Sequence, residues 1–199
     1  MALLGTLLRN NRPAEAKYAW NQANLAAPDT LQVTSRDFTD GGTLTPRHMG
    51  TRVGGENVSP HLAWSEPPAG TAALLLLIED LDAPLGASPA VHTLAAIDLA
   101  ALETPGELPA GALARKAPVG GVTLLRSVMS RGYFGPEPLK GHGPHRYVFQ
   151  LYALSQNLFS QTPGAGPDRE TVLKTKPRAV LAAVGPVLAR GRLTGICER

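Results

Sequence analysis

The sequence predicts a mainly β fold, in which two antiparallel sheets form a sandwich with a few peripheral helices. Short apolar runs alternate with clusters of turn residues along most of the chain, a pattern typical of antiparallel sandwiches. The 18 prolines and 21 glycines among 199 residues also indicate many turns, because both residue types interrupt helices. The hydrophobic share of 43% excludes a disordered chain, and the length fits one main domain.

Residues 1–29 are predicted to form a helical arm that precedes the main domain of residues 30–199. The leucines within residues 3–8 have helical spacing, Pro13 interrupts the pattern, and residues 14–27 are expected to form a second short helix. Unpaired leucines would expose an apolar patch. The arm is therefore expected to pack on the domain or on a second subunit, which leaves a homodimer open.

The main domain contains the predicted strands in order. Residues 72–78 form a continuous apolar run bounded by turn signals, which predicts a central strand buried on both faces. Aromatic and β-branched residues make 146–154 the clearest strand of the chain. Further strands are expected at 31–35, 61–64, 92–98 and 188–197, and a helix with Pro177 in its first turn at 176–184.

Charge and composition exclude several classes of protein. The formal net charge is +3 and the bases are scattered. Their only loose cluster, residues 174–178, holds no aromatic residue for base stacking, so no nucleic-acid partner is expected. The apolar start has no basic residue before it, and the longest later apolar run is too short to span a bilayer, so no signal peptide and no stable membrane insertion are predicted. A single cysteine cannot form an internal disulfide, which fits a reducing, cytoplasmic setting.

Acids and imidazoles stand where apolar strands meet loops rich in Gly and Pro. Asp80, Asp82 and Pro84 follow the central strand, and His92 begins the next one. Gly and Pro can hold a loop still without side-chain bulk, as a rigid pocket mouth requires. Asp80 is assigned to the ligand, whereas Asp82 is expected to hold its loop through backbone N–H groups.

The second stretch runs from Gly132 to Tyr147 and supplies the other half of the predicted site. His145 follows a Gly-rich loop, and Tyr147 lies on the same strand face by the period of two. An imidazole and a phenol side by side can both donate to a phosphate oxygen. The predicted ligand is therefore a small polar molecule that contains an anion, whereas His61 and His142 are assigned structural or exposed positions and His48 is left unassigned.

Other chemistries fit the sequence less well. Two His and two Asp could ligate zinc, but no pair has the spacing of the stronger metal motifs, so neither a metal nor a cofactor is predicted. The chain has no Gly-x-Ser-x-Gly elbow and no phosphate-loop motif. An enzyme that uses His92 and His145 as acid and base remains the alternative. A binding protein is preferred, because no nucleophile can be named.

At these residues the chain resembles the phosphatidylethanolamine-binding protein family, also called the Raf kinase inhibitor protein family, in its bacterial branch. Asp80-Leu81-Asp82-Ala83-Pro84 is similar to the family's Asp-Pro-Asp-Ala-Pro motif, and residues 133–147 resemble its Gly-rich loop ending in Gly-x-His-Arg-Tyr. Residues 55–64 resemble its Gly-x-Asn-x-Ser-Pro-x-Leu-x-Trp segment, and residues 191–199 its last strand. The resemblance covers residues 30–199.

The resemblance implies a two-sheet sandwich with a small anion pocket at one end. By motif position, the residues that form this pocket would be Asp80, Asp82, Pro84, His92, Gly135, His145 and Tyr147. It implies binding of a phosphate-containing small molecule or lipid headgroup and, in some members, inhibition of a kinase or protease, without a settled catalytic activity. Leu81 and Leu139 replace prolines of the family pattern, and the segment around His92 lacks its tryptophans, so the aromatic wall of the pocket rim is expected to be lost.

Overall fold

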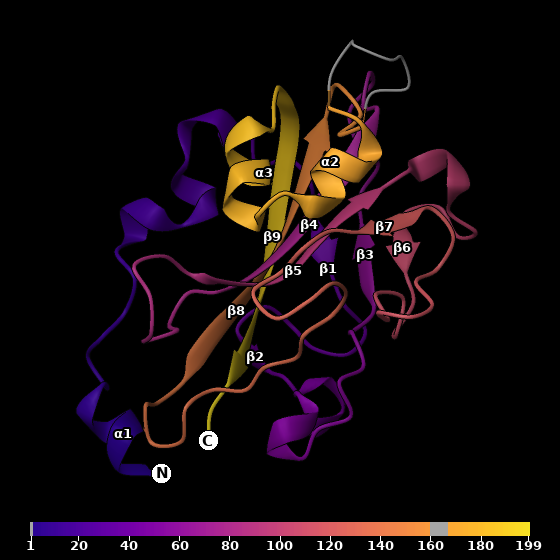
Figure 1. Ribbon diagram of the computed structural model, residues 1–199. Helices are drawn as coiled ribbons and strands as arrows, with labels where there is room; N and C mark the ends of the chain where they lie inside the picture. Colours follow the sequence, from indigo (N-terminus) through magenta and orange to yellow (C-terminus); the bar gives the residue numbers. More distant parts are fainter. Residues whose placement is uncertain (1, 160–166) are drawn as a thin grey trace.

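The computed structural model describes residues 2–159 and 167–199 and confirms the mainly β fold with two sheets (Figure 1). The smaller sheet has the order β1-β3-β6 and the larger one the order β2-β9-β8-β4-β5-β7. All paired strands are antiparallel except β2, which pairs parallel with β9 at the edge of the larger sheet. The strands are β1 (Val33–Thr34), β2 (Gly42–Thr43), β3 (Leu62–Trp64), β4 (Ala73–Asp80), β5 (Ala90–Ile97), β6 (Glu107–Leu108), β7 (Val122–Leu124), β8 (His145–Leu154) and β9 (Val187–Cys197).

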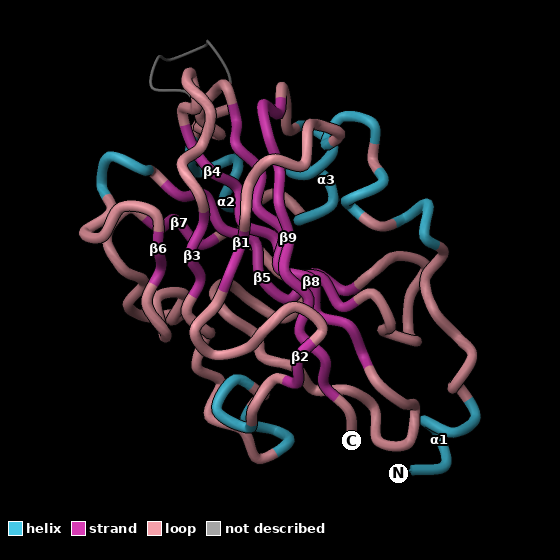
Figure 2. Tube along the Cα trace, turned by 180° about the vertical axis from the view of Figure 1, so that it is seen from behind, coloured by secondary structure: helices cyan, strands magenta, loops and turns pink. Residues whose placement is uncertain are grey.

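The helices are short and lie at the periphery. They are α1 (Ala2–Leu7), α2 (Arg169–Lys174) and α3 (Pro177–Ala183), together with single 3-10 turns at Glu15–Lys17, Ala19–Asn21, Ala23–Leu25, Pro46–His48, Thr51–Val53 and Leu99–Ala101. Helices α2 and α3 lie against one face of the larger sheet (Figure 1), and the smaller sheet lies on the opposite side, nearest the viewer in Figure 2.

The central strand β4 shows why the larger sheet needs a layer on each side. All eight of its residues are buried, as the continuous apolar run predicted. Leu74, Leu76 and Ile78 belong to the core between the two sheets. Leu75 and Leu77 point to the other face, where they join a second apolar cluster with residues of α2, α3 and the arm. Because successive side chains of a strand point to opposite faces of the sheet, β4 contributes residues to two separate cores.

The arm differs from the prediction in its secondary structure and in the exposure of the leucines of α1. Residues 14–27 do not form a second helix but three consecutive 3-10 turns, each flanked by extended residues. Ala19 and Leu25 are fully buried in the second apolar cluster, so this part of the arm contributes to the core of the domain. By contrast, Leu3 and Leu7 of α1 are exposed.

Candidate ligand-binding site

Three adjacent strands bring the predicted polar residues together at one end of the larger sheet. Strand β4 lies between β5 and β8, and its last residue, Asp80, is in register with Ala90 of β5 and Tyr147 of β8. His92 lies two residues beyond Ala90, and His145 lies two residues before Tyr147 on the same face. Asp80 and His145, which are 65 positions apart, therefore meet in one cluster with His92 and Tyr147, because neighbouring strands end together.

Asp80 lies at the centre of the cluster, between the two histidines. Its Oδ2 atom lies 2.9 Å from His145 Nδ1 and 4.0 Å from His92 Nε2. Its Oδ1 atom accepts a hydrogen bond from the Asp82 backbone N–H at 2.9 Å. Because an ionised carboxylate only accepts hydrogen bonds, His145 must carry its proton on Nδ1, which leaves Nε2 with a free lone pair when the ring is neutral.

His92 is held in the same tautomer by a different partner. Its Nδ1 atom lies 2.8 Å from the Phe134 carbonyl oxygen, which can only accept, so Nδ1 carries the proton. Burial lowers the pKa of His92 below its usual value, and the nearby Asp80 charge offsets part of this effect. The ring is therefore neutral at pH 7, with Nε2 as an acceptor.

Two polar atoms in the cluster are buried without a hydrogen-bond partner among the described residues. They are His145 Nε2 and Tyr147 Oη. Burial, followed by the Asp80 charge, raises the pKa of Tyr147, so the phenol keeps its proton and acts as a donor. A buried polar group without a partner costs about 1–3 kcal/mol, so both atoms are suited to meet a polar ligand or a water molecule.

The loop before β8 forms one wall of the cluster. Phe134 stacks on His92 with ring centroids 5.0 Å apart, and the Arg52 guanidinium lies 5.3 Å from the centroid of the Phe134 ring. Gly135 donates its N–H to Asn57 Oδ1 at 2.8 Å, and a Cβ at Gly135 would lie 2.4 Å from the His48 carbonyl oxygen. Only glycine permits so close an approach, so the loop is fixed by contact with residues 48–57.

Asp82 and Pro84 lie in the loop after β4, where they contact arginine side chains and the arm. Both carboxylate oxygens of Asp82 accept hydrogen bonds from Arg146, and Oδ1 also accepts one from Arg12. Burial alone would raise the pKa of Asp82, but these bonds hold it below the usual value. The expectation that Asp82 organises its loop therefore agrees with its contacts, although side-chain guanidinium groups supply most of the donors. Pro84 is buried, and its carbonyl accepts from Asn11.

The first residues of the arm are seated on the rim of the cluster. Asn11 donates to the Pro84 carbonyl at 2.6 Å, and its own carbonyl lies 3.3 Å from His142 Nε2. The His142 ring is fully buried and meets the His145 ring edge-on, with centroids 4.7 Å apart. Gly5 of α1 packs so closely on the backbone of residues 140–142 that a Cβ would lie 2.2 Å from the Lys140 oxygen. The arm therefore packs on the rim beside Pro84 and His142.

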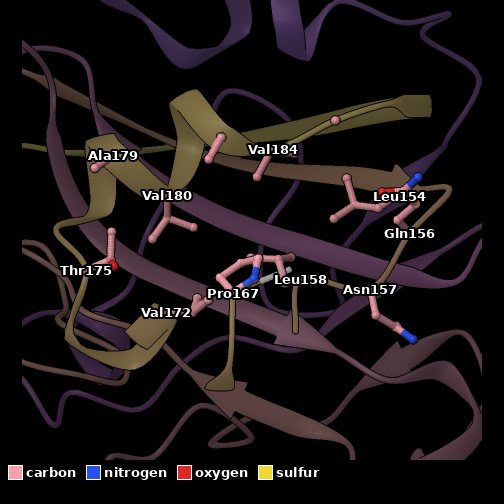
Figure 3. Close-up of a pocket in the computed structure, with 12 residues that line it drawn as sticks. Leu154, Gln156, Asn157, Leu158, Pro167, Val172, Thr175, Ala179, Val180 and Val184 are labelled. Carbon is pink, nitrogen blue, oxygen red and sulfur yellow. The ribbon is translucent and has the colours of Figure 1, made fainter. Parts of the chain in front are cut away.

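A cavity of a different character lies away from the cluster (Figure 3). It has a volume of about 210 Å³ and lies between α2, α3 and the end of β8. Its lining is mostly apolar, with Val172, Val180 and Leu158 among the residues, and none of the described residues that line it has a titratable side chain. It therefore lacks the groups that a charged ligand would require.

The fold and the cluster together define a class of protein, a two-sheet β sandwich with a buried carboxylate, two imidazoles and a phenol at one end of the larger sheet. A family model described as phosphatidylethanolamine-binding protein matches residues 34–197. The chain belongs to that family. No helix among the described residues is both long and apolar enough to cross a membrane.

Relatives support the same assignment. The UPF0098 protein of Aquifex aeolicus is 30% identical over 172 residues, which cover 85% of this chain and 89% of that protein. LppC of Mycobacterium tuberculosis, named as a lipoprotein, is 36% identical over 193 residues, covering 96% of this chain and 84% of that protein. The crystal structure of Escherichia coli YbcL, described as a member of the mammalian PEBP family, superimposes with a TM-score of 0.65 at 28% identity and covers 85% of this chain and 98% of its own.

Sequence reasoning missed three neighbours of the cluster. His142 was assigned a structural or exposed position, yet its ring contacts His145. Phe134 supplies an aromatic wall beside His92, although the sequence around His92 predicted that this wall is lost. Asn57 adopts a left-handed conformation with φ of 58°, from which its side chain reaches Tyr133 and Gly135. Asn tolerates this conformation better than most residues, but an isolated sequence does not reveal where the chain requires it.

Proposed function

We propose that this chain is a small-ligand-binding and regulatory protein whose buried cluster takes a phosphate-type anion, either a small phosphorylated molecule or a lipid headgroup. The observation that carries the proposal is the pair of buried, unpartnered polar atoms, His145 Nε2 and Tyr147 Oη, in one cluster with His92. A phosphate group offers several oxygens to such donors and acceptors in a small space.

The tautomers indicate which protonation state of the ligand fits best. With both rings neutral, Nε2 of His92 and Nε2 of His145 are acceptors, and Tyr147 Oη is a donor. A monoanionic phosphate could donate its own P–O–H to one imidazole and accept from the phenol. If His145 takes up a proton instead, its contact with Asp80 compensates the new charge. In either case the complex holds one proton more than a dianionic phosphate and a neutral His145 would hold together.

A binding role fits the surroundings better than catalysis does. Cys197, the single cysteine of the chain, lies opposite His145 in the β8–β9 ladder. Burial, and then the Asp80 charge, raise the pKa of its thiol to about 11, partly offset by Arg199. The thiol therefore stays protonated at neutral pH and is a poor nucleophile. The proposal accordingly assigns no enzymatic activity to the two imidazoles.

Regulation is proposed to occur through a protein partner, a kinase or a protease, whose activity the ligand-bound or ligand-free domain modulates. A cytoplasmic setting belongs to the same proposal and is supported by the single buried cysteine. Pulldown with ligand-saturated and ligand-free protein, followed by kinase and protease assays of the captured proteins, would test this part.

Titration calorimetry tests the ligand directly. Inorganic phosphate and phosphoethanolamine are titrated into the intact protein and into His145→Ala, with His61→Ala as the matched control, because His61 contacts Arg36 and Glu107 outside the cluster. Loss of a hydrogen bond to a charged group should cost about 1.5–3 kcal/mol of binding free energy in His145→Ala only. Equal affinities in the two variants would contradict the anion site.

A further inference from the structure

Beyond the buried cluster, a surface hairpin combines exposed apolar side chains with a basin of positive charge. Arg126 and Arg131 are bridged as an antiparallel pair, and the Ser127 backbone N–H donates to the Ser130 carbonyl at 2.7 Å. These contacts enclose a two-residue tip, Val128 and Met129, whose residues are 51% and 54% exposed. The tip is anchored, because Val128 donates its N–H to the Val91 carbonyl in β5.

The basin lies at the base of this hairpin, beside the C-terminal end of α2. It has a volume of about 450 Å³ and is lined by Arg115, Arg126, Ser130, Arg131 and Lys174. Arg126 and Arg131 each donate one N–H to a carbonyl at the end of α2, of Lys174 and Leu173 respectively, both at 2.8 Å. These bonds orient the guanidinium groups and leave further N–H donors on each, since arginine has five.

Four cations thus share one shallow surface. One of them, Lys174, pairs with the Glu170 carboxylate at the surface. An exposed pair of this kind is weak, so it neutralises only a small part of the local charge. A surface of this charge attracts anions.

We propose that this hairpin and basin form a docking surface for an anionic lipid bilayer. A soluble anion would account for the basin but not for the two exposed apolar side chains beside it. A bilayer accounts for both features, because its phosphate layer meets the arginines while the apolar tip enters the headgroup region. The chain would bind at the surface without spanning the membrane, and this inference does not depend on the proposed ligand of the buried cluster.

Cosedimentation with vesicles tests the proposal. The full chain is mixed with vesicles of phosphatidylcholine plus phosphatidylglycerol, and separately with phosphatidylcholine alone. Binding is expected only to the anionic vesicles and should weaken as salt rises. Each cation near an anionic surface contributes a factor of roughly five in affinity, so Arg115→Gln should weaken binding about fivefold. Met129→Ser should weaken it as well.

Matched controls separate this surface from others. Arg47→Gln removes the same charge from an exposed position outside the basin, and Leu7→Ser removes an exposed leucine from α1. Both should bind nearly as well as the parent chain, and thermal unfolding should confirm that all four variants fold.

Three results would overturn the proposal. Equal losses in Arg47→Gln and Arg115→Gln would mean that net charge alone drives binding. A loss confined to Leu7→Ser would assign the contact to α1. If polyglutamate binds the parent chain more tightly than it binds the Arg115→Gln variant, and anionic vesicles bind neither, the basin binds a soluble acidic partner instead.

Discussion

Removal of residues 2–12, which pack on the rim of the buried cluster, should strengthen phosphate binding there by easing access to it. Their polar contacts with the rim include the Arg12–Asp82 ion pair and the two hydrogen bonds of Asn11. Arg12 is about one-third exposed, so its ion pair is worth about 0.2–1 kcal/mol, and each hydrogen bond adds about 0.5–1.5 kcal/mol. After the cost of ordering the chain, a net closing free energy of about 1–3 kcal/mol remains.

A closed state favoured by this amount weakens a ligand that needs the open state by roughly 5- to 150-fold. The truncated protein should therefore bind phosphate tighter by a factor in that range, as measured by titration calorimetry. The truncation must stop before residue 15, because Ala19 and Leu25 are buried in the core. Unchanged or weaker affinity would refute the reasoning.

A point variant checks the same idea without shortening the chain. Gly5→Ala places a Cβ 2.2 Å from the Lys140 oxygen and 2.7 Å from the His142 nitrogen, both backbone atoms that cannot easily move. It should dislodge α1 and shift phosphate affinity in the same direction as the truncation. Gly120→Ala is the matched control, because its Cβ would lie 3.4 Å from the nearest backbone atom, an ordinary contact. A shift in the control as large as that in Gly5→Ala would exclude the steric explanation.

Three further predictions concern stability. Burial lowers the folded-state pKa of His92, so below about pH 6.5 the unfolded state takes up a proton that the folded state does not, and the free energy of unfolding should fall as the pH falls. His92→Gln should reduce this loss, measured by urea unfolding at several pH values, and an unchanged dependence of the unfolding free energy on pH would contradict the prediction. Glu79→Ala should cost about 2–4 kcal/mol of unfolding free energy, because the buried donors of Ala19 and Gln150 lose their acceptor, whereas Glu170→Ala at the surface should cost little. Gly135→Ala should cost about 1–3 kcal/mol through overlap with the His48 carbonyl, and near-wild-type stability would show that the loop can yield.

The strands could be predicted where the apolar pattern is long. Strand β4 was clear because six successive apolar residues are buried on both faces, and β8 because its aromatic and β-branched residues favour strands. Strands β2, β6 and β7 have two or three residues each, too few for a recognisable period. The 3-10 turns of the arm arise from tertiary burial of Ala19 and Leu25, which overrides the local helical pattern.

The site was predictable in its centre but not in its surroundings. Asp80, His92 and His145 stand at strand ends, and strand ends that pair in one sheet bring their residues together. The arm's position on the rim, where Asn11 contacts His142 across 131 positions, and the contact of the His142 ring with the His145 ring both depend on loop packing. No periodicity encodes such a contact. The role of Asp82 was recognisable as structural, but its guanidinium partners, Arg12 and Arg146, became evident only from the fold.

Nitrogen-detected NMR of the imidazole rings during a phosphate titration tests the anion site most directly. The spectra report the protonation and hydrogen bonding of each ring nitrogen, so the five histidines of the chain can be followed separately. Phosphate should shift Nε2 of His145 and of His92, whose Nδ1 atoms stay bonded to Asp80 and Phe134, while His61 remains unchanged. Unchanged Nε2 resonances of both His92 and His145 at saturating phosphate would contradict the account.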